Sequence, residues 1–243
     1  MWALSVGVGA FLTGRRVALV GAGPGDPELM TLRAQAELAA AARVVSDAAV
    51  ERLARRFAPR AEVVVVPDGP AAVRVLLDAV SKGDGPVVRL YAGDPWLHPA
   101  HGEELTGLQR AGVSTDAVAG VAVEVAVPAR AGIPVNVRQL AVVCTVGPVE
   151  AVPWSVDPAH TLVISGDDGR ATARQLLERG GHAVPAAILP IGGEAGEVRG
   201  VLSDLAGGSE PGVPSLLVVG AVAAPGLTGG GSHRRSAPAS GSG

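Results

Sequence analysis

The chain has 243 residues, of which 48% are hydrophobic and only 2% aromatic, and its formal net charge is −3 at pH 7. This length allows one large or two small domains, and the weak negative charge excludes a strongly basic surface for nucleic acid or an anionic membrane. The single cysteine, Cys144, excludes a disulfide framework and a cysteine metal site, and we expect it to pack in a core.

The beginning of the chain is apolar from Met1 to Leu12, but it has no basic start, and Gly14-Arg15-Arg16 follows instead of a cleavage site. We therefore expect residues 1–15 to be a disordered N-terminal extension and not a signal peptide. No stretch approaches the roughly 20 apolar residues that span a bilayer. These features predict a cytoplasmic protein.

Short apolar runs then alternate with alanine- and leucine-rich segments, and most runs end in Gly, Asp or Pro. Strands are predicted at 17–20, 43–47, 62–67, 86–91 and 113–118, and helices at 31–42, 48–57, 71–82, 103–111 and 121–131. This alternation predicts a mostly parallel α/β sheet with ligands beyond the carboxyl ends of its strands. The glycine-rich turn at 21–25 is such an end, but Asp26 stands where a dinucleotide fingerprint needs its third glycine.

A second half is expected after Ile133-Pro134. Its predicted elements are strands at 140–145, 160–165, 186–190 and 215–222, and a helix at 171–179. Residues 225–243 are mostly small or polar and are expected to form a disordered tail. The predicted division is an N-terminal α/β domain over 16–134 and a C-terminal α/β domain over 135–224. The five histidines show no complete ligand spacing, so no metal site is expected.

Several motifs occur in a fixed order along residues 16–224. They are Val20-Gly-Ala-Gly-Pro-Gly-Asp-Pro-Glu-Leu29, Val44-Val-Ser-Asp47, Arg89-Leu-Tyr-Ala-Gly-Asp-Pro-Trp96, His101-Gly-Glu-Glu104, Ala111–Gly120 and Pro128-Ala-Arg-Ala-Gly-Ile-Pro134. Together they resemble the tetrapyrrole methylase family. The resemblance implies two α/β domains, S-adenosylmethionine as methyl donor in the cleft between them, and a homodimer.

The resemblance also implies roles for particular positions. Asp47 would be the catalytic proton acceptor, although the residues alone favour an N-cap of the helix that begins at 48. The donor would be held largely by backbone groups. The residues implied in donor binding are Pro24, Ala92, Gly93, Asp94, Leu97, Ala122, Val123 and Gly166, with Ser165 beside the last.

Some side chains depart from the family pattern. Tyr91 replaces a lysine, Ala92 a glycine, Ala100 lies near an arginine position, and Ala122-Val123 replaces Thr-Ser. These departures concern the acceptor more than the donor, because a carboxylate-rich acceptor should meet arginine or lysine in the cleft. The candidate arginines are Arg33, Arg89, Arg130 and Arg138, and each is equally explained as a solvated surface charge.

Five further side chains lie in or just after the third motif. His98 and His101 are expected to be loop histidines, with acceptor contact or acid chemistry as the alternative. Trp96 is expected to line the cleft by packing. Glu103 and Glu104 begin a helix, where carboxylates suit the helix dipole without any catalytic role.

The activity implied by the resemblance is S-adenosylmethionine-dependent C-methylation of a tetrapyrrole. The expected reaction converts uroporphyrinogen III to precorrin-2, in sirohaem or cobalamin biosynthesis. The alternatives are a methylase with another acceptor, and a methylase-like domain that binds ligands or partners without turnover. Donor binding without methyl transfer would distinguish this last case.

Overall fold

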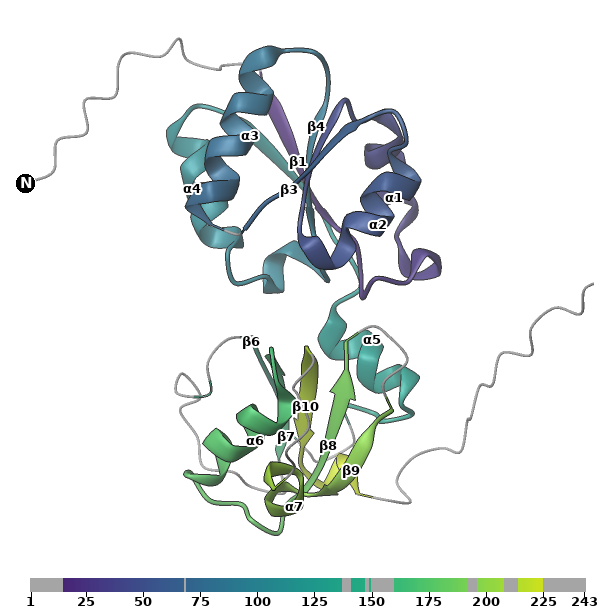
Figure 1. Ribbon diagram of the computed structural model, residues 1–243, viewed down its shortest axis with the longest axis vertical. Coiled ribbons are helices and arrows are strands. Elements are labelled where there is room, and N and C mark those ends of the chain that lie inside the picture. Colours follow the sequence, from purple (N-terminus) through teal and green to yellow (C-terminus); the bar gives the residue numbers. More distant parts are fainter. Residues whose placement is uncertain are drawn as a thin grey trace, which may run out of the picture.

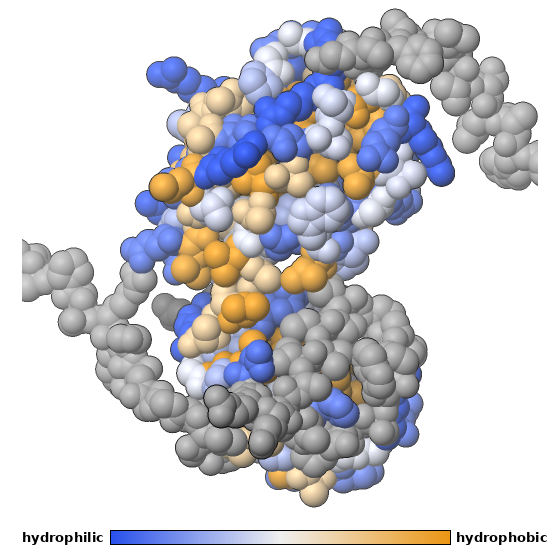
Figure 2. Space-filling view, turned by 180° about the vertical axis from the view of Figure 1, so that it is seen from behind, coloured by the Kyte–Doolittle hydropathy of each residue, from blue (hydrophilic) through white to orange (hydrophobic). Residues whose placement is uncertain are grey.

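The computed structural model describes residues 15–67, 69–136, 160–191, 196–207 and 214–224, the backbone of 141–146, and Val149. Within these residues the chain forms two sheets of five strands each. Figure 1 shows them as two lobes stacked along the long axis, and Figure 2 shows a waist between them. No helix among the described residues is long and apolar enough to cross a membrane.

The N-terminal lobe has a fully parallel sheet in the order β3-β2-β4-β1-β5. Its strands are β1 (Arg16–Gly21), β2 (Arg43–Ser46), β3 (Glu62–Val65), β4 (Val87–Tyr91) and β5 (Ser114–Val118). Its helices are α1 (Leu32–Ala40), α2 (Glu51–Phe57), α3 (Pro70–Lys82) and α4 (His101–Arg110). The predicted parallel sheet is thus confirmed, and its strands all end at the edge that faces the other lobe (Figure 1).

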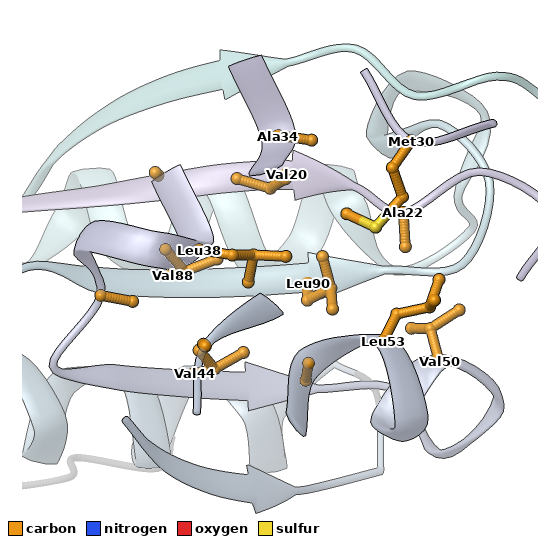
Figure 3. Close-up of a cluster of buried hydrophobic side chains, with 14 of the residues drawn as sticks. Val20, Ala22, Met30, Ala34, Leu38, Val44, Val50, Leu53, Val88 and Leu90 are labelled. Carbon is orange, nitrogen blue, oxygen red and sulfur yellow. The ribbon is translucent and has the colours of Figure 1, made fainter. Parts of the chain in front are cut away.

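Two apolar cores cover the faces of this sheet. Along β1, Ala18 and Val20 pack under α1 and α2, while Val17 and Leu19 pack under α3 and α4. This alternation follows from the two-residue period of a strand buried on both faces. Figure 3 shows the first of these cores, where Val20 and Leu38 lie among the side chains of β1, β4 and α1.

The C-terminal lobe has a mixed sheet in the order β6-β7-β10-β8-β9. Its strands are β6 (Ala141–Val146), β7 (His160–Gly166), β8 (Pro185–Pro190), β9 (Val198–Val201) and β10 (Ser215–Val219). Only β6 and β7 pair in parallel within the described residues; β10 runs antiparallel to β7 and β8, and β9 antiparallel to β8. Helices α6 (Gly169–Leu177) and α7 (Leu202–Ala206) cover one face.

Helix α5 (Val123–Arg130) covers the other face of this second sheet. Its Val127 packs with Val163 of β7 and Leu189 of β8, so it belongs by packing to the C-terminal lobe although it precedes residue 134. The predicted domain boundaries remain predictions. The first turn of the helix expected at 48–57 is a short 3-10 helix (Ala48–Val50), and β9 and α7 were not predicted.

Several expectations lie outside the described residues. These are the N-terminal extension up to residue 14, the tail at 225–243, the side chain of Cys144 and residue Arg138.

Candidate functional site

The loops that follow β1, β4 and β5 meet through glycines at the edge of the first sheet. Gly23 and Gly93 exchange two backbone hydrogen bonds of 3.1 and 2.8 Å. Gly93 has φ +72°, a left-handed conformation that side chains resist. A Cβ on Gly120 would collide with the carbonyl oxygen of Gly93, so the two loops can touch only because this position is glycine.

Asp94 holds this arrangement in place. Its Oδ1 accepts a hydrogen bond of 2.8 Å from the Trp96 backbone N–H and thereby caps a short 3-10 helix at Pro95–Leu97. Its Oδ2 accepts a hydrogen bond of 3.0 Å from the Gly120 N–H. The carboxylate is therefore occupied by the loops themselves, and a ligand beside it would meet mainly backbone groups.

A cleft of about 710 Å³ lies between the lobes, and we call it the interlobe cleft. Six of the eight predicted donor-binding residues line it: Ala92, Gly93, Asp94, Leu97, Val123 and Gly166. Four carboxylate residues line it as well, namely Asp94, Glu124, Asp167 and Asp168. The described residues of its lining include no lysine or arginine. The interlobe cleft is thus an acidic site, and it would favour a cationic ligand.

A second cavity of about 460 Å³ adjoins the interlobe cleft, and we call it the arginine cavity. It is lined by Arg52 and Arg56 of α2, Arg130 of α5 and the glycine-rich loop at 23–27. The two cavities share Ala49, Ala92, Val123 and Ile191. Pro24, the seventh predicted donor-binding residue, lines the arginine cavity, and Ala122 borders neither cavity.

Asp47 follows the end of β2 and is bonded to Ala92, one of the residues that line both cavities. Its Oδ2 accepts a hydrogen bond of 2.8 Å from the Ala92 N–H and lies 3.3 Å from Nε2 of His98, while its Oδ1 is 2.5 Å from Nη1 of Arg89. Asp47 stands at the N-cap position of the turn that begins at Ala48, but its carboxylate makes no hydrogen bond to that turn, so the expected side-chain cap is absent. The side chain instead contacts Arg89 of the neighbouring strand β4 and Ala92, which follows that strand.

The electrostatic surroundings keep Asp47 ionised. Burial alone would raise the pKa of this carboxyl group. The hydrogen bond from His98, the charge of Arg89 and the N–H of Ala92 outweigh burial and lower the pKa of Asp47 from 3.8 to about 2. At neutral pH, Asp47 is therefore a negatively charged proton acceptor and a weak base.

The ion-pair partner of Asp47 is Arg89, whose guanidinium group is fully buried. Its Nε and Nη2 bind the two carboxylate oxygens of Glu104 at 2.8 and 3.0 Å, and Glu104 is fully buried too. The hydroxyl of Tyr91 donates to Glu104 at 2.8 Å, and the Tyr91 ring lies 4.3 Å from the guanidinium carbon. The interpretation of Arg89 as a solvated charge or an acceptor contact is thus wrong, because burial encloses it on every side.

Of the two expected loop histidines, His98 lies in the loop between the 3-10 helix and α4, whereas His101 is the first residue of α4. His98 lines the interlobe cleft, and its ring lies 5.0 Å from the ring of Tyr91. His101 is buried between the rings of Tyr91 and Trp96, and burial lowers the pKa of its imidazole, which favours the neutral form. His98 therefore lies closer to the candidate chemistry than the sequence predicted.

The remaining arginine candidates lie in different places. Arg33 is exposed and forms an ion pair of 2.6 Å with Asp116, away from both cavities. Arg130 lines the arginine cavity, while Arg52 and Arg56 were not singled out in the sequence. Their spacing of four residues on one predicted helix was the signal available. Among the described residues no group of three His, Cys, Asp or Glu side chains is placed to hold a metal.

Comparison with known proteins gives consistent matches. The profile of the family described as Tetrapyrrole (Corrin/Porphyrin) Methylases matches residues 16–206. The chain is 36% identical to siroheme synthase 1 of Aeromonas salmonicida over 85% of this chain and 49% of that protein. It is 30% identical to the uroporphyrinogen-III C-methyltransferase of Methanobacterium ivanovii, over 79% of this chain and 90% of that protein.

The fold is also similar to solved structures. The Thermus thermophilus uroporphyrin-III C-methyl transferase complexed with S-adenyl homocysteine superposes with a TM-score of 0.73 at 32% identity. That match covers 85% of this chain and 98% of the other. By contrast, the chain spans about half the length of the siroheme synthases that it matches.

Proposed function

The chain belongs to the tetrapyrrole methylase family, and from that premise we propose that it transfers a methyl group from S-adenosylmethionine to a carbon atom of a tetrapyrrole. The observation that carries this proposal is the interlobe cleft, whose lining brings Gly93, Val123 and Gly166 together from the two lobes. Two further lining residues, Ala92 and His98, contact Asp47. A cleft of about 710 Å³ has room for a ligand of this size.

The lining of the interlobe cleft suits this donor. A sulfonium is a cation and supplies an electrophilic methyl group when bound. The carboxylates of Asp94, Glu124 and Asp168 place negative charge around the cleft, and Gly93, which lines it, has no side chain to fill the space. The protein's part is then to hold donor and acceptor in line, since correct placement by itself removes much of the barrier.

Asp47 is the group that we assign to proton removal. Attack by a pyrrole carbon on a methyl group leaves a cationic ring, and that ring must lose a proton to become neutral. A cationic ring is acidic, so a carboxylate with a pKa of about 2 suffices as its proton acceptor. The same negative charge stabilises the cation while it forms.

The proposed acceptor is uroporphyrinogen III, with precorrin-2 as product, in sirohaem or cobalamin biosynthesis. The similarity to the Methanobacterium uroporphyrinogen-III C-methyltransferase and the Thermus uroporphyrin-III C-methyl transferase supports this acceptor. The homodimer remains a prediction from the family resemblance, and the cytoplasmic location remains a prediction from the sequence.

The test begins with calorimetric titration of the protein with S-adenosylhomocysteine, for which we expect micromolar affinity, on the order of −8 kcal/mol. Gly93→Leu should abolish binding, because the side chain would meet Val123 in a strained backbone conformation. Methyl transfer to uroporphyrinogen III is then measured for the wild type and for Asp47→Asn, whose kcat should fall by about 10²- to 10⁴-fold with donor affinity kept. Binding without any transfer by the wild type would favour a methylase-like binding module instead.

A further inference from the structure

The arginine cavity has a charge opposite to that of the interlobe cleft beside it. Arg52, Arg56 and Arg130 line it, and Asp26 is the one acidic residue in its described lining. The Asp26 carboxylate is already engaged, since it accepts a hydrogen bond of 2.9 Å from the Glu28 N–H. A cationic cavity therefore adjoins an anionic one across a wall of small and apolar residues.

The three arginines have no carboxylate partner among the described residues. Arg130 donates to the Pro190 carbonyl at 3.2 Å, and Arg56 lies 5.4 Å from the ring of Phe57. Arg55, on the same helix, behaves differently, because it forms an ion pair of 2.7 Å with Glu51. Guanidinium groups gathered without counter-charge repel one another, and an anionic ligand relieves that repulsion.

The position of the arginine cavity indicates which substrate would supply the anionic groups. Ala49 and Ala92 line both cavities, and the N–H of Ala92 is bonded to Asp47. A ligand in the arginine cavity that reached over this junction would bring its own atoms beside Asp47 and the interlobe cleft. Pro24, Ala92 and Val123, which the family resemblance assigns to the donor, line this cavity too. The donor's sulfonium is a cation and suits the acidic interlobe cleft, whereas an anionic ligand suits the arginine cavity, so charge distinguishes the acceptor from the donor here.

We propose that Arg52, Arg56 and Arg130 form the site that binds the carboxylates of the acceptor. This inference rests on the proposed function. Guanidinium groups match carboxylates in geometry as well as in charge. The arginines would thereby replace the basic side chains that the family resemblance led us to expect at Tyr91 and Ala100.

The experiment compares the wild type with Arg52→Ala, Arg56→Ala, the double variant and the matched control Arg55→Ala. All three positions are exposed on α2, so the fold should survive, and circular dichroism checks this. Steady-state methyl transfer is measured with uroporphyrinogen III, and donor-site affinity is measured by calorimetry with S-adenosylhomocysteine. Direct binding is measured by the fluorescence of uroporphyrin III, the stable oxidised ring that carries the same carboxylates as uroporphyrinogen III.

We expect Arg52→Ala and Arg56→Ala each to raise KM for uroporphyrinogen III roughly three- to tenfold, with kcat and S-adenosylhomocysteine affinity unchanged. The affinity of these variants for uroporphyrin III should fall in parallel. In the wild type this affinity should weaken as salt is added, because salt screens the charges. The control Arg55→Ala should match the wild type in all these measurements. An unchanged KM in the double variant would overturn the inference and leave the methyltransferase intact. An equal loss of S-adenosylhomocysteine affinity would assign the arginines to the donor and also overturn it. Failure of the wild type to methylate uroporphyrinogen III while still binding S-adenosylhomocysteine would reject the proposed function, and this inference with it.

Discussion

Replacing Arg89 with methionine tests the buried charge network most directly. The substitution removes a guanidinium that contacts both carboxylate oxygens of Glu104 and one oxygen of Asp47. Glu104 is fully buried and Asp47 is 8% exposed, so water cannot replace the lost partner. Removing one partner of a buried pair costs about 3–5 kcal/mol, because the other charge stays buried and uncompensated.

The expected result is a large loss of stability. For a chain of this length, about 3–5 kcal/mol lowers the unfolding midpoint by roughly 6–20 °C. A second variant, Arg89→Met with Glu104→Gln, should recover about 2 kcal/mol of that loss, because the amide still accepts from Tyr91 and carries no charge. Arg55→Met, which removes a partner from an exposed pair, should stay within about 0.5 kcal/mol of the wild type.

The assay is urea denaturation at pH 7 together with differential scanning calorimetry. The reasoning is refuted if Arg89→Met costs less than about 1 kcal/mol, or if adding Glu104→Gln brings no recovery. Either result would mean that the two carboxylates find protons or water without the arginine. Equal losses for Arg89→Met and Arg55→Met would refute it as well.

Three further predictions concern the same site. The pKa of Asp47 is lowered in the folded state from 3.8 to about 2, so its ionised form stabilises the fold by about 2 kcal/mol. This stabilisation is present above pH 4 and is lost as the pH falls towards 2. Unfolding measured over an acid titration should show the loss in the wild type and not in Asp47→Asn. His98→Leu removes the hydrogen bond that most lowers this pKa, so the acid limb of the kcat/KM profile should move to higher pH, and an unmoved limb would exclude the contact as its cause. Gly120→Ala forces a Cβ against the Gly93 carbonyl and should cost about 1–3 kcal/mol in urea unfolding and weaken S-adenosylhomocysteine binding; wild-type values for both would show that the loops do not need this close approach.

The sequence alone was enough to predict most of the local structure of the N-terminal lobe. Apolar runs such as 86–91 are the signature of strands buried on both faces, and the glycines and prolines after them mark the turns. The motifs around Gly93 and Asp94 also pointed to the correct edge of the sheet, where the interlobe cleft lies. These signals are carried by consecutive residues, so they can be read without knowing what lies opposite.

The C-terminal lobe was less predictable, since its strand order and directions depend on which strands pair. The short β9 and α7 have too few residues to show a period, and the antiparallel pairing of β10 with β7 and β8 follows from packing. Helix α5 likewise looks like a continuation of the first half, yet it covers the second sheet.

The identity of each polar side chain's partner was decided by tertiary structure. Asp47 precedes a helical turn and fits an N-cap pattern, but the register that sets Ser46 beside Leu90 brings its carboxylate to the N–H of Ala92. Arg89 shares a face of β4 with the buried Val87, which was the one sequence sign that this charge would be enclosed. Its partner Glu104 comes from a helix that follows later in the chain. A local pattern specifies which face of an element is buried, whereas a buried charge is stabilised only by groups that the assembled elements bring to it.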